Sequence, residues 1–399
     1  MSGILRLMRL AGICAILSVM ASVASFASDT FIPGDRDADH VVTDAEMALA
    51  EQDYKNGNIS SSDLGQIKLI HDRYPVEVTD SAGNDIKIYR PLERVVVLNG
   101  LVTEMMQILN ATDVIIGVTS DLKNEPLISP TLKSLSAVGK VTEPDLEAIL
   151  QLDPDAVINY ASTSWKSDEI QKKLHKANPN LIVVRLDMHH PETHVKEVET
   201  LAAILDRESE AREYINFYDG VMDRIKRAIE GLSDDRRPRV YFEERKDYQT
   251  GSNESYFSED TALAGGRNVF ADMPAVYPVV DQESIMAKNP DIIIRTSYNR
   301  SSGGYTNDDI SDMQELQKSI IDRPGSEDIS AVKAGRVYIL NGYLIGGARH
   351  IIGLSYLAKI IHPDLLSDFD PVQVHQRYLD LLGFEFDLNK HNAFVLPKL

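Results

Sequence analysis

A short pattern that occurs twice constrains the fold of this chain more than any other feature. The copy that starts at Glu147 reads EAILQLDPDAVI, and the copy that starts at Glu283 reads ESIMAKNPDIII. Each has a glutamate, apolar residues at helical spacing, Pro-Asp, and then an apolar run typical of a buried strand. Because this helix–turn–strand unit stands in both halves, we expect two similar lobes that each present one glutamate. Two lobes imply a cleft, and a matched glutamate pair implies a partner that contacts both.

Strands and helices alternate along most of the chain, which predicts an α/β fold class with parallel sheets. A β-hairpin around a Gly-Asn turn is predicted over 76–89 and opens this region. We expect an N-terminal α/β lobe over 75–190 and a C-terminal α/β lobe over 236–399, both Rossmann-like. The predicted strands are 94–98, 114–117, 156–159, 181–185, 240–243, 291–295 and 336–340.

Residues 191–235, between the lobes, are predicted to be a linking helical region. From Glu208 onward apolar residues recur with the period of a helix. About 25 helical residues span about 37 Å, so one backbone helix is long enough to run from lobe to lobe.

Residues 1–27 are typical of an export signal. Arg6 and Arg9 precede an apolar stretch over 10–24, and a small-x-small cleavage site follows at 25–27. We expect cleavage after Ala27 and a secreted or otherwise extracytoplasmic location, in a periplasm or at the outer face of a membrane; an uncleaved anchor is the alternative. Cys14, the only cysteine, lies in this segment, so the mature chain has no thiolate ligand and no disulfide.

Residues 28–74 predict a small all-α module with a calcium loop. The segment DRDADHVVTDAE has the spacing of an EF-hand loop, which takes oxygen ligands at positions 1, 3, 5, 7, 9 and 12. His40 stands at position 6, where glycine is usual because the backbone turns sharply there. A solvated charge run is the alternative. The predicted Ca²⁺ ligands are Asp35, Asp37, Asp39, Val41 (through its carbonyl), Thr43 and Glu46.

A second, weaker loop and helix follow over 56–71, and the tandem resembles a dockerin-like module. The resemblance covers about 45 residues of the chain. It implies calcium-dependent folding and a cohesin-like partner.

The main body, about 75–385, resembles the helical-backbone (class III) solute-binding proteins of ABC importers. The resemblance rests on the order of several stretches: VTDSAGNDIKI, PDLEAILQLDPDAVI, ALAGGRNVF, VDQESIMAKNPDIII, AVKAGRVYIL and YLAKIIHPDLL. It implies capture of a ferric siderophore, haem or cobalamin in the interlobe cleft, with an ABC transporter permease as partner. It also implies that Glu147 and Glu283 pair with arginines of that permease.

Candidate ligand contacts are aromatic, arginine, asparagine and histidine residues in loops that follow predicted strands. The carboxyl ends of parallel strands line the cleft in such folds, and aromatic faces with arginine donors suit a bulky anionic ferric chelate. A haem would need a Tyr or His on iron, for which His189 or His190 is a candidate. His189 and His190 are adjacent, so we expect their rings to point apart and to form a poor metal pair. The candidates are Asn99, Tyr160, Trp165, His189, Arg245, Tyr248, Tyr298, Arg300 and Arg349.

Charge and motif content narrow the function. The net charge of −20 argues against nucleic acid as a partner, because phosphate contacts need clustered Lys and Arg. The chain has no nucleophile elbow, phosphate loop or helix with paired metal-ligating histidines. We expect a binding protein for an iron chelate without a catalytic step. The alternatives are a haem or cobalamin receptor and a secreted, dockerin-tethered enzyme acting on polysaccharide.

Overall fold

A five-stranded sheet forms the centre of each lobe in the computed structural model, which describes residues 31–162, 165–299, 302–345 and 347–399. The N-terminal sheet has the order β5-β4-β3-β8-β9 and is parallel throughout. Its three central strands are almost wholly buried because helices cover both faces. The strands are β3 Val95–Val97, β4 Ile115–Val118, β5 Ser136–Ala137, β8 Ala156–Asn159 and β9 Ile182–Arg185.

The remaining elements of the N-terminal lobe are short. They include the predicted hairpin, whose strands pair antiparallel from Val76 opposite Ile88 to Thr79 opposite Asp85. The hairpin strands are β1 Val76–Thr79 and β2 Asp85–Ile88, and a second small pair is β6 Gly139–Lys140 and β7 Glu143–Pro144. The helices are α3 Gly100–Ile108, α4 Pro130–Ser134, α5 Leu146–Gln151 and α6 Ser167–Ala177, with the 3₁₀ turn η1 Ser120–Asn124.

The C-terminal sheet has the order β11-β10-β12-β13-β14. Its first four strands are parallel, and β14, from the end of the chain, joins antiparallel to β13. The strands are β10 Arg239–Glu243, β11 Arg267–Asn268, β12 Ile292–Ser297, β13 Val337–Asn341 and β14 Val395–Leu396. The helices are α9 Tyr256–Leu263, α10 Gln282–Lys288, α11 Ser311–Ile321, α12 Ser330–Lys333, α13 His350–Ile361 and α14 Pro371–Leu382, with 3₁₀ turns η3 Asp234–Arg236, η4 Ser326–Asp328, η5 Gly342–Leu344 and η6 Gly347–Arg349.

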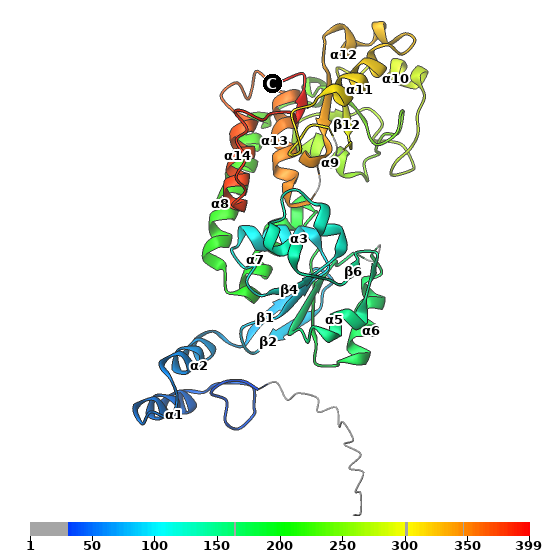
Figure 1. The fold of residues 1–399 in the computed structure, drawn as a ribbon. Coiled ribbons are helices and arrows are strands. Elements are labelled where there is room, and N and C mark those ends of the chain that lie inside the picture. Colours follow the sequence, from blue (N-terminus) through cyan, green and yellow to red (C-terminus); the bar gives the residue numbers. More distant parts are fainter. Residues whose placement is uncertain (1–30, 163–164, 300–301, 346) are drawn as a thin grey trace, which may run out of the picture.

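Two helices, α7 Pro191–Leu205 and α8 Glu208–Ile229, occupy the linking region. Asp206, at φ +58°, ends α7 and turns the chain into α8. The 22 residues of α8 cover about 33 Å, and Figure 1 shows α8 along one side of the elongated molecule, beside both lobes. The predicted two-lobed α/β fold with a connecting helix is confirmed.

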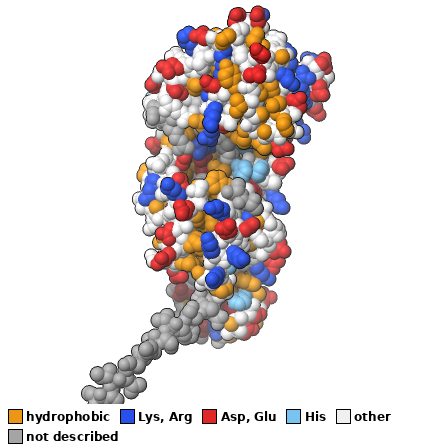
Figure 2. Space-filling model, turned by 90° about the vertical axis from the view of Figure 1, so that its right-hand side faces the viewer, with side chains coloured by type: hydrophobic (Ala, Val, Ile, Leu, Met, Phe, Trp, Pro, Cys, Tyr) orange, Lys and Arg blue, Asp and Glu red, His pale blue; other side chains and the backbone are white. Residues whose placement is uncertain are grey.

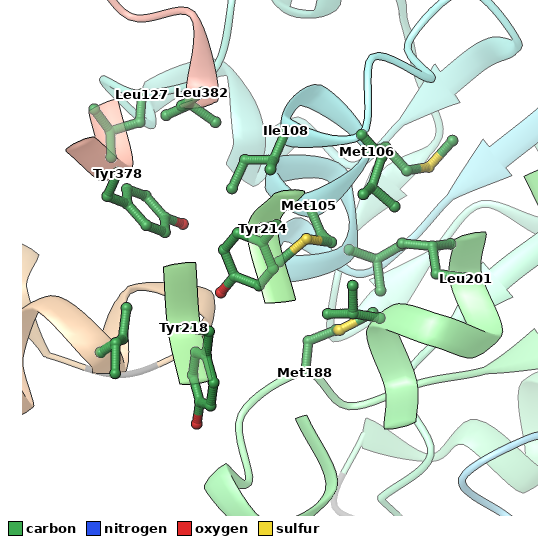
Figure 3. Packing of buried hydrophobic residues seen from close by; sticks show 14 of the residues in the cluster. Met105, Met106, Ile108, Leu127, Met188, Leu201, Tyr214, Tyr218, Tyr378 and Leu382 are labelled. Atoms are coloured by element: carbon green, nitrogen blue, oxygen red, sulfur yellow. The ribbon is translucent and has the colours of Figure 1, made fainter. Parts of the chain in front are cut away.

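The core is continuous across the junction of the lobes. Figure 3 shows Met105 of α3 and Tyr378 of α14 on either side of Tyr214 of α8, and all three are fully buried. Met188, in the loop after β9, belongs to the same cluster. Because interiors are close-packed, this cluster holds the lobes and α8 in one arrangement.

The N-terminal segment forms the predicted helix pair, α1 Asp44–Lys55 and α2 Ser61–Arg73. Each helix begins with a capping box, Thr43 with Glu46 in α1 and Ser60 with Asp63 in α2. Figure 1 shows the pair at the end of the N-terminal lobe that lies away from the C-terminal lobe. Within the described ranges, no helix combines the length and the apolar character needed to cross a membrane.

Candidate ligand-binding site

A cavity of about 620 Å³ lies between the two lobes. Its lining comes from the start of α3, the loops after β4 and β8, the loop after β10, the end of β12 and the turns η5 and η6. These are the carboxyl ends of the central strands, where ligands bind in open α/β sheets. Figure 2 shows the waist between the lobes hollowed on the face that it presents.

Two stacked aromatic rings form the wall on the N-terminal lobe. The rings of Tyr160 and Trp165 lie 4.8 Å apart between centroids, with 22° between their planes. Burial raises the pKa of Tyr160 to about 12, so its hydroxyl is protonated at neutral pH and can donate a hydrogen bond. This wall offers a flat apolar face with one polar group.

The facing wall, on the C-terminal lobe, pairs an aromatic ring with a guanidinium. The Arg245 guanidinium carbon lies 4.2 Å from the centroid of the Tyr298 ring. The Tyr298 hydroxyl donates to Glu244 at 2.8 Å and lies 3.2 Å from the Tyr256 hydroxyl, which fixes the ring. The Arg245 side chain is 66% exposed, so a ligand can reach its donors.

A salt bridge joins the two lobes at the cavity. Arg349 lies at the end of η6, and its Nε donates to Glu104 Oε2 in α3 at 3.1 Å. The Arg349 Nη2 is 3.0 Å from the same oxygen and 3.7 Å from Glu125. Burial alone would lower the pKa of Arg349, but Glu104, Tyr378, Tyr305 and Glu125 together outweigh it, with Glu104 contributing most, and the net shift of the pKa is upward. Tyr378 donates to the second Glu104 oxygen.

Of the nine predicted ligand contacts, Tyr160, Trp165, Arg245, Tyr298 and Arg349 line the cavity. Asn99 is buried behind the lining, where its side chain caps α3 and donates to the Leu186 carbonyl. Tyr248 is partly buried and lies against the Arg323 guanidinium, 4.3 Å from the ring centroid, away from the cavity lining. His189 is not among the lining residues, and Arg300 lies outside the described residues.

The prediction missed the acidic side of the cavity. Glu104 is the only charged residue in α3, whose sequence is GLVTEMMQI, and it is 2% exposed. A single carboxylate within an apolar helix was the available signal, because such a group is rarely buried without a partner. Other lining residues that were not predicted include Thr119, Asp121, Glu125, Asn299, Asn341 and Tyr343.

The repeated glutamates are exposed in the first turns of matched helices. Glu147 lies in α5 and Glu283 in α10, after the N-caps Asp145 and Asp281. Each N-cap accepts hydrogen bonds from backbone amides of its helix, which fixes the helix start. Figure 1 shows α5 and α10 on the side of the molecule opposite α8, one on each lobe.

Three of the six predicted calcium ligands lie together. Carboxylate oxygens of Asp35, Asp37 and Asp39 lie within 4.8 Å of one another. His40, at loop position 6, has φ +71°, the left-handed conformation for which glycine is usual there. Glu46 is outside this group, because its carboxylate accepts from the Thr43 amide and hydroxyl and from the Arg36 amide. The backbone N–H of Val41 donates to Asp39.

Comparison with known proteins finds a matching family and several relatives. The family model described as periplasmic binding protein matches residues 95–344. The ABC transporter substrate-binding lipoprotein YvrC of Bacillus subtilis is 24% identical over 317 residues, 78% of this chain and 93% of YvrC. A cobalamin-binding protein of Halobacterium salinarum is 26% identical (55% of this chain, 58% of that protein), and the Fe(3+)-citrate-binding protein YfmC of B. subtilis is 27% identical (62% and 72%).

The fold agrees with this family. The crystal structure of the TroA-like periplasmic binding protein FepB from Veillonella parvula superposes with a TM-score of 0.70, covering 81% of this chain and 99% of FepB at 22% identity. Proteins of this kind bind substrates and are not enzymes, which removes the polysaccharide-degrading alternative. The family match spans more than half of the chain, and the chain therefore belongs to the periplasmic binding protein family, as the solute-binding component of an ABC importer.

Proposed function

We propose that this protein binds an iron chelate outside the cytoplasm and delivers it to the permease of an ABC importer. The observation that carries the proposal is the lining of the interlobe cavity, where the Tyr160–Trp165 stack faces the Arg245–Tyr298 pair. Flat aromatic faces contact the rings or apolar arms of a chelator, while arginine donors contact its carboxylate or phenolate oxygens. The relative that binds ferric citrate supports iron as the cargo metal.

Cavity size and lining weigh against other cargo classes. A volume of about 620 Å³ suits a drug-sized organic ligand, whereas a small oxyanion would leave most of it empty. Haem iron takes an axial His, Tyr or similar ligand; the described lining has no histidine, but Tyr160, Tyr298 and Tyr343 belong to it, so haem stays a competing cargo. Cobalamin, the ligand of the Halobacterium relative, is the main competing cargo.

Titration of the tag-free mature protein tests the cargo. Trp165 is the only tryptophan, so its fluorescence reports on the cavity directly. We expect quenching at 1:1 stoichiometry by a ferric hydroxamate, catecholate or citrate, and no change with molybdate. Binding of cobalamin or haem with no response to any ferric chelate would contradict the proposal. Trp165→Phe, measured by calorimetry, separates loss of signal from loss of binding.

We propose further that Glu147 and Glu283 dock the protein onto the permease. Both carboxylates are exposed, one on each lobe, in helices that are fixed by their N-caps. A charge-assisted pair with an arginine has defined geometry, and two such pairs, one on each lobe, would set the orientation of the protein on a two-fold partner. Exposed charges of this kind influence encounter and orientation more than affinity.

We also propose that the N-terminal helix pair binds calcium through Asp35, Asp37 and Asp39. The loop conformation at His40 supports this, and the Val41 carbonyl would complete the set by loop position. Glu46 would contribute only after leaving its capping box with Thr43. Hydrogen exchange over 35–46, compared in calcium and in EGTA, tests the site: protection that is unchanged by EGTA would contradict it.

The cohesin-like partner stays a prediction from the resemblance. The exposed residues Leu49 and Tyr54 are the surface to mutate in a pull-down.

A further inference from the structure

A second group of metal-ligating side chains lies in the loop between β9 and α7. One ligand atom from each of Asp187, His189 and His190 lies within 4.8 Å of the others. The two imidazole centroids are 4.1 Å apart, although adjacent histidines were expected to point apart. Met188, at φ +60°, turns the chain between Asp187 and the two histidines, which brings the carboxylate to the same side as the rings. None of these residues lines the interlobe cavity.

Asp187 carries a buried charge for which the fold supplies no cation. Asp187 is 7% exposed, and in the described part of the chain it forms no salt bridge. Its Oδ1 accepts from the amides of Ala161 and Ser162, each at 2.9 Å, while no described residue donates to Oδ2. The Oδ2 atom is not among the fully buried side-chain atoms that lack a partner, so solvent or an ion can reach it. A bound cation there would balance the charge of the carboxylate.

Each of the two histidines has a ring nitrogen that is free to bind a metal ion. Nδ1 of His189 lies 3.3 Å from the Asp187 carbonyl, which leaves its Nε2 for another partner. The ring nitrogens of His190 have no hydrogen-bond partner among the described residues, and the His190 side chain is exposed. A histidine that bonds a backbone carbonyl through one ring nitrogen commonly binds metal through the other.

Hydrogen bonds to a buried carboxylate fix the backbone that carries these ligands. Glu197 of α7 is 3% exposed, and its carboxylate accepts from the amides of Asp187 at 3.0 Å and Met188 at 2.6 Å. Ser81 donates to the same carboxylate. These contacts hold Met188 in its left-handed conformation, so the three ligands are brought together before any ion binds.

We propose that Asp187, His189 and His190 form a binding site for a divalent transition-metal ion, separate from the cargo cavity. Two imidazoles and one carboxylate suit Zn²⁺ or Ni²⁺ and not Ca²⁺ or Mg²⁺, which prefer oxygen ligands. Ligand bonds of about 2.0–2.2 Å need the three donor atoms to move closer, which side-chain rotation of His189 and His190 can supply. Water or an added ligand completes the coordination shell.

Calorimetric titration of the tag-free mature chain with ZnCl₂ and with NiCl₂, in excess CaCl₂ to fill oxygen sites, tests this. We expect one ion per chain. His190→Ala and Asp187→Asn should each weaken binding at least about tenfold. Asp187→Asn keeps the Oδ1 acceptor for the two amides and removes the charge. His391→Ala, which changes an exposed histidine paired with Asp308 in the C-terminal lobe, is the matched control and should bind as the wild type does.

Two results would overturn the site. One is wild-type binding no tighter than that of a His189→Ala, His190→Ala double variant. The other is Zn²⁺ binding that survives in the double variant and is lost in Asp35→Asn, which would place the ion in the N-terminal loop. An unchanged melting temperature of metal-free His190→Ala shows that its loss of binding does not come from unfolding.

Discussion

Arg349 of the C-terminal lobe and Glu104 of the N-terminal lobe form a buried ion pair across the ligand cavity, with 3.1 Å between Nε and Oε2. The Arg349 side chain is 13% exposed and the Glu104 side chain 2%. Since Tyr378 of α14 donates to the same carboxylate, a single residue of α3 fastens two elements of the opposite lobe. This contact therefore contributes both to stability and to the charge that a ligand meets.

Glu104→Gln should lower the free energy of unfolding by about 3 kcal/mol, because it leaves a buried guanidinium without its main counter-charge. Urea unfolding followed by circular dichroism measures this. Glu213→Gln is the control, since Glu213 pairs with Arg377 at 2.6 Å while both side chains are about half exposed or more. The control should lose less than about 1 kcal/mol. Equal losses in both variants would contradict the role assigned to Glu104.

Trp165→Ala should weaken binding of an aromatic ferric chelate about tenfold, because the variant loses the outer ring of the Tyr160 stack. Aromatic contacts contribute about 0.5–1.5 kcal/mol each, and a tenfold change is about 1.4 kcal/mol. Calorimetry gives the affinity without relying on tryptophan fluorescence. Trp165→Phe should recover most of the loss. If alanine and wild type bind equally, the stack is not a ligand contact.

Glu147→Gln with Glu283→Gln should abolish stimulation of the permease ATPase in reconstituted vesicles while the affinity for cargo stays unchanged. Both carboxylates are exposed and neither belongs to the cavity lining, so only docking should suffer. Glu143→Gln with Glu327→Gln removes an exposed carboxylate from each lobe and serves as the matched control. Loss of cargo binding in the first pair, or equal loss of stimulation in both pairs, would argue against docking by the repeated glutamates.

His375 should make the protein less stable in acid. Burial lowers the pKa of His375 to about 3, from an ordinary value near 6.5, so the folded protein keeps this ring neutral. The unfolded chain binds a proton there once the pH falls below about 6.5. The stabilising contribution is therefore present above pH 6.5 and is lost as the pH falls toward 3.

Urea unfolding between pH 6.5 and 4.5 measures this loss. His375→Gln should reduce the slope of unfolding free energy against pH by up to about 1.4 kcal/mol per pH unit. His391→Gln, at an exposed position, should leave the slope unchanged. An identical slope in His375→Gln and wild type would mean that this ring does not govern the acid sensitivity.

Much of the fold follows from local pattern. The strand β8 has the predicted bounds, 156–159, because Pro-Asp before it and its apolar run mark its ends. The antiparallel strand β14 has only two residues, Val395–Leu396, and its pairing with β13 depends on distant chain that local pattern does not report.

Cavity residues that directly follow a strand could be predicted from the sequence. Cavity residues that pair across the two lobes could not. Tyr160 and Tyr298 come directly after β8 and β12, so parallel-sheet topology places them at the cleft. Glu104 and Arg349 are 245 residues apart in sequence, and no local signal indicates their contact. The approach of Asp187 to His189 and His190 was not predicted, because the left-handed turn at Met188 has no marker such as glycine.

One helix, α8, packs against both lobes through fully buried Tyr214 and its neighbours. A helix that packs against both lobes restricts them to small rotations relative to each other, whereas flexible linker strands would permit large ones. Spontaneous opening of the lobes would then contribute little to the release of the cargo. We expect the work of separating the lobes to come from the ATP-driven transporter, acting through α5 and α10 on the side of the molecule opposite α8.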